Sequence, residues 1–321
     1  MNAANTSIPV TILTGYLGAG KTTLLNRILT DNRGEKVAVI VNEFGDIGID
    51  SQLVMNADEE ILEMNNGCIC CTVRGDLIRL VSSLFERQAK FDRLVIETTG
   101  LADPAPVLQS FLVDEIMRSQ TELDAVITVV DAKHLWEHWD SSEAQEQIAF
   151  ADVILLNKID LVSTDRVEVV AQQIRATNPF AKIYRTQNCE LPLDSILGVK
   201  AFDLKNALAI DPGFLGEAAH THDRTIAAIS ILKSGVVDSN KLTTWLDRLV
   251  QAQGKNIFRL KGILNVDDED RRFVLQGVHM LLEGRPGRPW QPHEQRQNQM
   301  VFIGRDLTEI TLTEGFRSCL V

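Results

Sequence analysis

The sequence has no apolar run close to the roughly 20 residues that a membrane-spanning helix requires. Residues 1–7 also lack the basic and apolar segments of a secretory signal peptide. These two absences argue against a membrane protein and against a secreted one. We therefore expect a cytoplasmic protein that has no membrane partner.

Basic residues are outnumbered: the chain has 32 Lys and Arg against 44 Asp and Glu, a formal net charge of -12 at pH 7. An acidic surface repels phosphate backbones, which argues against nucleic acid as a partner. A nucleotide is not excluded, because local N–H groups and Mg²⁺ set the field at such a site. Cysteine is scarce too, and three of the five cysteines lie within four positions. This spacing favours a metal or redox site in a reducing compartment over a disulfide framework.

The most informative segment is the glycine-rich stretch G-Y-L-G-A-G-K-T at residues 15–22, which fits the phosphate-binding P-loop pattern G-x-x-x-x-G-K-T. Residues 9–14 before it are apolar and β-branched and predict a buried strand. Residues 23–30 after it carry one apolar helical stripe. Strand, glycine-rich turn and helix are the context in which this pattern binds phosphate.

Each residue type in this loop has a chemical reason to be there. The glycines let successive N–H groups point at one anion, and the following helix adds the positive end of its dipole. We expect Lys21 to reach the β- and γ-phosphates, Thr22 to ligate Mg²⁺ and Thr23 to contact the α-phosphate. The expected phosphate-binding residues of the loop are Gly15, Gly18, Ala19, Gly20, Lys21, Thr22 and Thr23.

An alternation of strands and helices follows the P-loop and predicts an α/β fold, a P-loop NTPase with a mostly parallel sheet flanked by helices. The predicted strands lie at residues 35–42, 91–100, 123–131, 151–160 and 181–185. The predicted helices lie at residues 76–85, 103–117 and 164–177.

Two strand ends carry acidic residues that could serve a phosphate site. Asp46 follows N-E-F-G after the second strand, where either a nucleotide-sensing switch segment or a solvated turn would fit. Glu97 ends the third strand, where P-loop enzymes place an acid that holds Mg²⁺ or its water. A chance strand-terminal glutamate is the alternative for Glu97. Gly100 is placed to hydrogen-bond the γ-phosphate through its backbone. The catalytic candidates are Lys21, Asp46 and Glu97.

The fifth strand leads into N-K-I-D at residues 157–160, which fits the guanine-reading motif N-K-x-D. The Asp160 carboxylate can accept hydrogen bonds from both N1–H and the exocyclic amino group of guanine. Adenine lacks these donors, so the site would reject ATP. We expect Asn157 to bind the base and brace the P-loop, and the Lys158 stem to cover the ring. Thr186 falls where GTPases contact guanine through backbone groups.

Three cysteines, Cys68, Cys70 and Cys71, form a C-x-C-C motif that can converge on one ion. Thiolates suit Zn²⁺ or Cu⁺, and Zn²⁺ takes four ligands in a tetrahedron. Three cysteines leave one position open, which suits a transferable metal better than a closed structural site. A redox switch and simple burial of the cysteines are the alternatives.

The remaining histidines give weaker signals. His134 and His138 are spaced i, i+4 and could bind metal on a helix, but no third ligand is near and a helix surface is favoured. His220 and His222 lie in a stretch broken by proline and glycine that is better explained as a solvated linker.

Beyond the linker the pattern restarts and predicts a small α+β domain. Its expected strands lie at residues 225–232, 256–266, 272–282 and 299–304, and its helices at 238–253 and 308–319. A chain of 321 residues is long enough for two domains. We expect a GTPase domain at residues 1–200, a linker at 201–224 and the α+β domain at 225–321.

Five motifs occur in the order G-Y-L-G-A-G-K-T, V-N-E-F-G, G-C-I-C-C, E-T-T-G-L-A-D-P and N-K-I-D. Together they resemble the CobW-type GTPases, relatives of HypB and UreG, and the resemblance extends over nearly the whole chain. It implies GTP hydrolysis with Mg²⁺, coupled to the loading of a metal, commonly Zn²⁺, on Cys68, Cys70 and Cys71. It also implies delivery of that metal to a recipient metalloprotein, with Asp46 in the switch loop.

The sequence departs from the CobW pattern at three places. Many relatives carry a glutamate where this chain has Val41, so that ligand is missing. Histidine-rich linkers are reduced to His220 and His222, and the cysteine-proline docking segment of eukaryotic zinc transferases is absent. A zinc-buffering or redox-sensing protein in which GTP is only an effector is one alternative. A P-loop kinase is another, although N-K-x-D argues against it. The sequence leaves open whether the protein forms a homodimer.

Overall fold

The computed structural model describes residues 7–31, 34–42, 61–64, 72–86, 91–202, 226–291 and 294–321. The chain separates into two compact units, which are considered one at a time. The first unit is Met1–Gln172 with Ala181–Phe202, and the second is Gln173–Phe180 with Asp203–Val321. The expected linker at 201–224 lies almost entirely outside the described residues, so the predicted domain boundaries stay a prediction.

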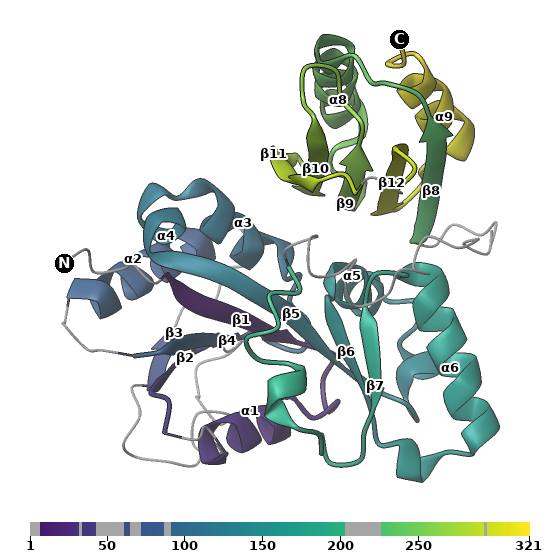
Figure 1. Ribbon diagram of the computed structural model, residues 1–321. Coiled ribbons are helices and arrows are strands. Elements are labelled where there is room, and N and C mark those ends of the chain that lie inside the picture. Colours follow the sequence, from purple (N-terminus) through teal and green to yellow (C-terminus); the bar gives the residue numbers. More distant parts are fainter. Residues whose placement is uncertain are drawn as a thin grey trace. The chain divides into compact units, whose positions relative to one another are not determined.

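The first unit is built on a seven-stranded sheet whose neighbouring strands are all parallel (Figure 1). The strands follow the order β3-β2-β4-β1-β5-β6-β7. Their bounds are β1 Ile8–Thr14, β2 Val37–Asn42, β3 Ile61–Met64, β4 Arg93–Glu97, β5 Thr121–Asp131, β6 Val153–Asn157 and β7 Lys182–Arg185. Because all strands run the same way, their carboxyl ends meet at one edge, where ligands bind in open α/β sheets.

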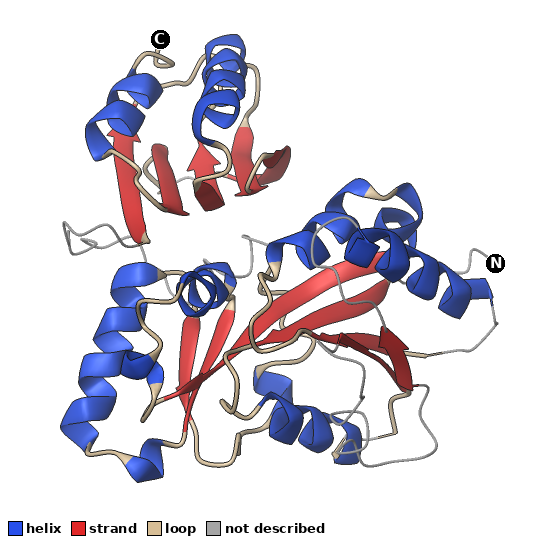
Figure 2. Ribbon diagram, turned by 180° about the vertical axis from the view of Figure 1, so that it is seen from behind, coloured by secondary structure: helices blue, strands red, loops and turns tan. Residues whose placement is uncertain are grey.

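Helices cover both faces of this sheet, as the front and back views agree (Figures 1 and 2). The α-helices are α1 Lys21–Thr30, α2 Thr72–Glu86, α3 Ala105–Val113, α4 Glu115–Gln120, α5 Ser142–Phe150 and α6 Thr164–Thr177. Three short 3₁₀ turns are η2 Leu135–Glu137, η3 Ile159–Leu161 and η4 Leu193–Ser195. Helix α1 presents Leu24, Leu25, Ile28 and Leu29 to one face of β1 and its neighbours, while α2, α3 and α4 gather on the opposite face.

The predicted fold class is confirmed, and the differences are local. Strand β3 was not predicted, nor was helix α5. The single helix expected at 103–117 is divided, because Asp114 adopts an extended conformation and its side chain accepts a hydrogen bond from Met117 N, capping α4. The histidines at 134 and 138 flank the 3₁₀ turn η2 rather than lying on an α-helix.

The second unit is a five-stranded antiparallel sheet with strand order β11-β10-β9-β12-β8. Its elements are β8 Ala227–Ser234, α8 Ser239–Gln253, β9 Ile257–Leu264, β10 Arg271–Val278, β11 Leu281–Pro289, β12 Gln297–Gly304 and α9 Glu309–Arg317. Helices α8 and α9 lie on one face of this sheet (Figure 1), where Leu246 and Phe316 join a common core with Leu260 and Phe302. The strand expected at 272–282 is wrong in its end, because it turns back at His279 and continues as β11.

No helix in the described part of the chain is long and apolar enough to cross a membrane.

Candidate nucleotide-binding site

The loop between β1 and α1 requires glycine at two positions because other backbone and side-chain atoms approach it closely. Gly15 has a φ of +140°, and a Cβ built on it would lie 2.3 Å from the Val129 carbonyl oxygen of β5. Gly20 has a φ of +118° and is the N-cap of α1, and a Cβ there would lie 2.7 Å from Asn157 Nδ2. Any side chain at either position would push the loop away from β5 or β6. The loop therefore turns tightly over the end of the sheet.

Lys21 begins α1 and extends across the loop that precedes it. Its side chain is buried, and Nζ donates to the carbonyl oxygens of Gly15 at 2.9 Å and Tyr16 at 3.4 Å. The first N–H groups of an α-helix have no acceptor within the helix. The ammonium group and the start of α1 thus place fixed positive charge at one spot, which favours binding of an anion.

Thr22 and Glu97 lie together although they are far apart in sequence. Glu97 is 4% exposed, and its Oε1 accepts a hydrogen bond of 3.4 Å from Thr22 Oγ1. Octahedral Mg²⁺ holds oxygen ligands at about 2.1 Å, which sets neighbouring ligands about 3 Å apart. The hydroxyl and the carboxylate are therefore spaced to hold one Mg²⁺, directly or through its water.

The segment after β4 packs closely on the P-loop. A Cβ built on Gly100 would lie 2.7 Å from the backbone nitrogen of Leu17, so only glycine fits there without displacement. Gln147 of α5 donates from Nε2 to the carbonyl oxygens of Gly100 at 3.2 Å and Ala102 at 3.1 Å. Gln147 was not predicted from the sequence, and it fixes the backbone whose Gly100 N–H is the expected γ-phosphate contact.

Asn157 at the end of β6 joins the base-reading motif to the phosphate loop. Its Nδ2 donates to the carbonyl oxygen of Ala19 at 3.0 Å. Its Oδ1 accepts from Thr186 Oγ1 at 3.1 Å and from the backbone N–H of Cys189 at 2.9 Å. Cys189 is buried beneath the loop, and burial raises the pKa of its thiol to about 12, so this cysteine packs as a neutral group.

Replacing Asn157 by alanine is expected to destabilise the nucleotide-free protein by about 3 kcal/mol. The physical reason is that three buried groups would each lose a hydrogen bond to this side chain: the Ala19 carbonyl oxygen, the Thr186 hydroxyl and the Cys189 backbone N–H. Urea unfolding measures the change. Exposed Gln187 in the same loop is a matched control, and Gln187→Ala should alter the unfolding free energy by less than about 0.5 kcal/mol. Equal stability of the two variants would show that the brace contributes nothing.

The other base-site residues occupy different environments. Asp160 lies in η3 and is exposed, so its carboxylate stays hydrated until a base covers it. Adenine is therefore excluded by a free-energy cost that arises on binding, when the base would cover the carboxylate without donating hydrogen bonds to it. Before a base binds, the site carries no such cost, because Asp160 is hydrated there. Thr186 is buried, and its backbone N–H donates to Leu156 O at 2.9 Å. It supports Asn157 in this structure, and its direct contact with guanine stays a prediction.

Lys158 has the left-handed φ of +60°, and its Nζ donates to Asp131 Oδ2 at 2.7 Å. Asp131 ends β5, and His134 Nδ1 lies 2.9 Å from the same oxygen. Burial alone would raise the pKa of Asp131, but hydrogen bonds from Lys158 and His134 outweigh it and hold the pKa below its usual value. Asp131 is therefore a carboxylate at neutral pH, and no motif in the sequence marks it.

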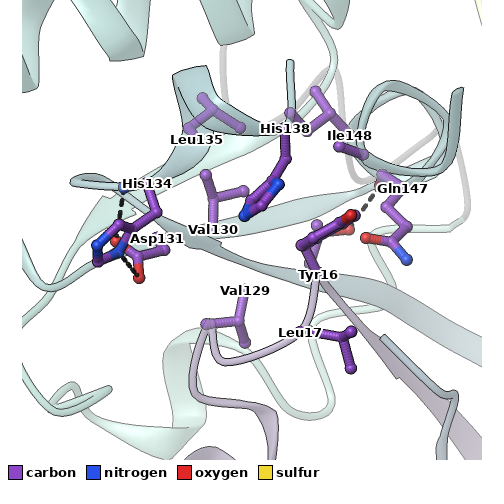
Figure 3. Close-up of a pocket in the computed structure, with 12 residues that line it drawn as sticks. Tyr16, Leu17, Val129, Val130, Asp131, His134, Leu135, His138, Gln147 and Ile148 are labelled. Atoms are coloured by element: carbon purple, nitrogen blue, oxygen red, sulfur yellow. Dashed lines mark hydrogen bonds and ion pairs between the residues drawn. The ribbon is translucent and has the colours of Figure 1, made fainter. Parts of the chain in front are cut away.

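The two histidines after β5 do not form a metal site. His134 points to Asp131, while the ring of His138 stacks on Tyr16 of the P-loop, with centroids 4.2 Å apart (Figure 3). Among the described residues, no group of three or more His, Cys, Asp or Glu side chains could hold a metal ion. The predicted metal ligands Cys68, Cys70 and Cys71, and the switch residue Asp46, lie outside those residues.

A parallel sheet, a glycine loop that opens a helix, a hydroxyl and an acid spaced for Mg²⁺, and N-K-x-D braced against that loop define a P-loop GTPase. The chain belongs to the CobW/HypB/UreG family: residues 9–185 match its nucleotide-binding domain, and residues 226–320 match the cobalamin synthesis protein cobW C-terminal domain.

Similar proteins extend over most of the chain. The zinc chaperone YjiA of Escherichia coli is 36% identical over 315 residues, covering 96% of this chain and 98% of its own. The zinc-regulated GTPase metalloprotein activator 1 of Dictyostelium discoideum is 38% identical over 253 residues, 67% of this chain and 53% of its own. A crystal structure of Zn(II)-bound YjiA GTPase from E. coli superposes with a TM-score of 0.79 at 30% identity, covering 98% of this chain and 100% of that one.

Proposed function

We propose that this protein is a GTP-hydrolysing metallochaperone that binds zinc through Cys68, Cys70 and Cys71 and delivers it to a recipient metalloprotein. The observation that carries the proposal is similarity along almost the whole chain to a protein named as a zinc chaperone. A relative named as a GTPase metalloprotein activator supports the coupling of GTP to delivery. This chain also has a nucleotide site in which a direct hydrogen bond, from Asn157 Nδ2 to the Ala19 carbonyl oxygen, joins the base-reading motif to the P-loop.

The order of strands supports a link between the cysteines and the nucleotide. Strand β3 runs parallel to β2 and ends at Met64, so its carboxyl end lies at the same sheet edge as the P-loop, which follows β1. In the sequence the three cysteines come four to seven positions after Met64. Residues 63, 41 and 97 are level across β3, β2 and β4. Two strand spacings, about 10 Å, separate the end of β3 from Glu97. Val41, buried under α1, offers no metal ligand here.

The nucleotide chemistry assigned to this site follows from the described groups. Lys21 and the N–H groups that begin α1 would bind the phosphates, and Gly100 N–H would bind the γ-phosphate as its charge develops. Thr22 and Glu97 would hold Mg²⁺, which neutralises charge on the phosphate oxygens. Asp160 would read the guanine edge. Asp46 and Glu97 stay candidates for orienting the attacking water, and slow intrinsic hydrolysis is expected because no arginine is assigned to the γ-phosphate.

Three thiolates bind Zn²⁺ and leave its fourth position open, so a recipient protein can enter the coordination sphere before the cysteines leave. GTP would change the geometry of the thiolates, and hydrolysis would relax it. A zinc-buffering or redox-sensing protein, in which GTP acts only as an effector, is the alternative. That alternative predicts negligible GTP turnover even with Mg²⁺, zinc and a recipient present.

Zinc affinity is expected to depend on the bound nucleotide. Chelator competition would measure the zinc Kd of the nucleotide-free protein, of the GDP complex and of the complex with a non-hydrolysable GTP analogue and Mg²⁺. We expect at least about a tenfold difference between the last two, since a useful coupling free energy is about 1–3 kcal/mol.

Replacement of Cys68, Cys70 and Cys71 together by serine should abolish the high-affinity zinc site. Cys319 is a buried free cysteine of the second unit, and Cys319→Ala provides the control that retains it. Identical zinc affinity in all nucleotide states would refute the coupling, because a ligand shifts only an equilibrium that it distinguishes.

A further inference from the structure

The turn that follows β5 contacts both halves of the nucleotide site, although it contains none of the motifs that identify that site. It begins at Asp131 and runs through η2 to His138 (Figure 3). At one end, Asp131 is hydrogen-bonded to Lys158 of N-K-I-D. At the other end, His138 stacks on Tyr16 of the P-loop. Of the two contacts, the one on the base side is the more tightly constrained. Asp131 forms a short ion pair with Lys158 there, and the same carboxylate oxygen also contacts His134.

We propose that Asp131 is a positioning residue for the guanine base, holding the side chain of Lys158 in the place where its stem covers the ring. The proposal rests on the guanine-nucleotide site of the proposed function. It concerns a residue outside the family motifs, and Asp131 acts through Lys158 without touching the nucleotide itself.

The contacts of Asp131 divide between its two oxygens. Oδ1 accepts from the backbone N–H groups of Lys133 at 2.8 Å and His134 at 3.1 Å, which closes the turn. Oδ2 faces Lys158 Nζ at 2.7 Å and His134 Nδ1 at 2.9 Å. One oxygen therefore fixes the carboxylate on its own turn, and the other presents a fixed anion to the lysine.

A held lysine binds a base better than a mobile one. Lysine has a long side chain with many rotamers, and ordering it on binding lowers affinity. Here the backbone of Lys158 is already in a left-handed conformation, and its ammonium group is already paired. The stem is thus ordered before the base arrives, and the ordering cost is removed from the binding step.

Asp131→Asn separates this role from the folding of the turn. Asparagine keeps an Oδ1 acceptor for the two backbone N–H groups, since it forms the same type of turn. It loses the charge that holds Lys158. We expect the variant to bind GDP and IDP each about tenfold more weakly, with an unchanged ratio of the two affinities. The ratio is preserved because inosine differs only at the edge that Asp160 reads. In GTP hydrolysis the loss should appear mainly in KM, with kcat lowered less than twofold.

A double-mutant cycle with Lys158→Met tests whether Asp131 acts through the lysine. Methionine keeps an unbranched stem without the charge, so adding Asp131→Asn to it should weaken GDP binding by less than twofold more. Lys133→Ala is the matched control, because its exposed side chain shares the turn and only its backbone N–H contacts Asp131. It should bind GDP with wild-type affinity.

Three results would overturn the inference: wild-type GDP affinity in Asp131→Asn, full multiplication of the two effects in the double variant, or a changed GDP to IDP ratio. Thermal unfolding without nucleotide shows whether each variant is folded. Failure of the wild-type protein to bind GDP would instead refute the proposed function, so the two failures are distinguishable.

Discussion

Asp160→Asn is expected to weaken GDP binding about 1,000-fold and to create affinity for XDP. In the proposed site the aspartate would accept hydrogen bonds from guanine N1–H and from the exocyclic amino group, and each hydrogen bond to a charged group contributes about 1.5–3 kcal/mol. Asparagine offers one acceptor and one donor, which match N1–H and the 2-carbonyl oxygen of xanthine. The exposed position of Asp160 in η3 lets either base reach it without rearrangement of the core.

Fluorescence competition with GDP, XDP and ADP measures this change in specificity. Asp165→Asn in the first turn of α6 is the matched control, since Asp165 is an exposed aspartate near the motif but not in it. Its GDP affinity should equal that of the wild type. If Asp160→Asn also retained wild-type GDP affinity, the base would be read elsewhere and the assignment of N-K-I-D would be wrong.

Lys21→Ala is expected to lower the rate of GTP hydrolysis by about two to three orders of magnitude, the usual effect of removing one preorganised group that stabilises transition-state charge. The ammonium group of Lys21 is already held at the mouth of the loop by Gly15 and Tyr16. The ammonium group would then not need to move to stabilise the negative charge that develops as the γ-phosphate is transferred. Single-turnover hydrolysis at saturating GTP measures the chemical step apart from binding.

The control for Lys21→Ala is Lys36→Ala, which removes an exposed lysine before β2 whose backbone N–H accounts for its hydrogen bond to Asp92. We expect wild-type turnover in that variant. Loss of GTP binding in Lys21→Ala with an unchanged rate at saturation would show that the lysine acts equally on the ground state and the transition state.

The parts of the site that the sequence predicted are those whose chemistry is local. The P-loop glycines and Lys21 lie within a few positions of one another, so their spacing alone specifies a phosphate cradle. The P-loop pattern predicts Thr22 as a Mg²⁺ ligand, and the end of a strand predicts Glu97. The parallel sheet then brings their oxygens within 3.4 Å, which sequence spacing could not supply.

The parts that were missed depend on which strands are neighbours. Asp131 meets Lys158 because β5 lies beside β6, and Gln147 reaches Gly100 across 47 positions. A glutamine on a short, mostly buried helix has no pattern of its own. Strands β3 and β7 both have only four residues, too few to show a period, but β7 follows a predicted helix in the α/β alternation and β3 does not. The break at Asp114 lies inside an apolar stretch, so periodicity alone did not reveal it.

The position of β3 in the sheet has a mechanical consequence. Among the strands that the structure describes, β3 pairs only with β2, whereas β1, β4, β5 and β6, which carry the nucleotide site, each have two neighbours. Local opening is cheapest where the fewest ladder hydrogen bonds are broken, so β3 can separate from the sheet while the four central strands remain closed. The platform that holds the nucleotide therefore does not depend on the pairing of β3.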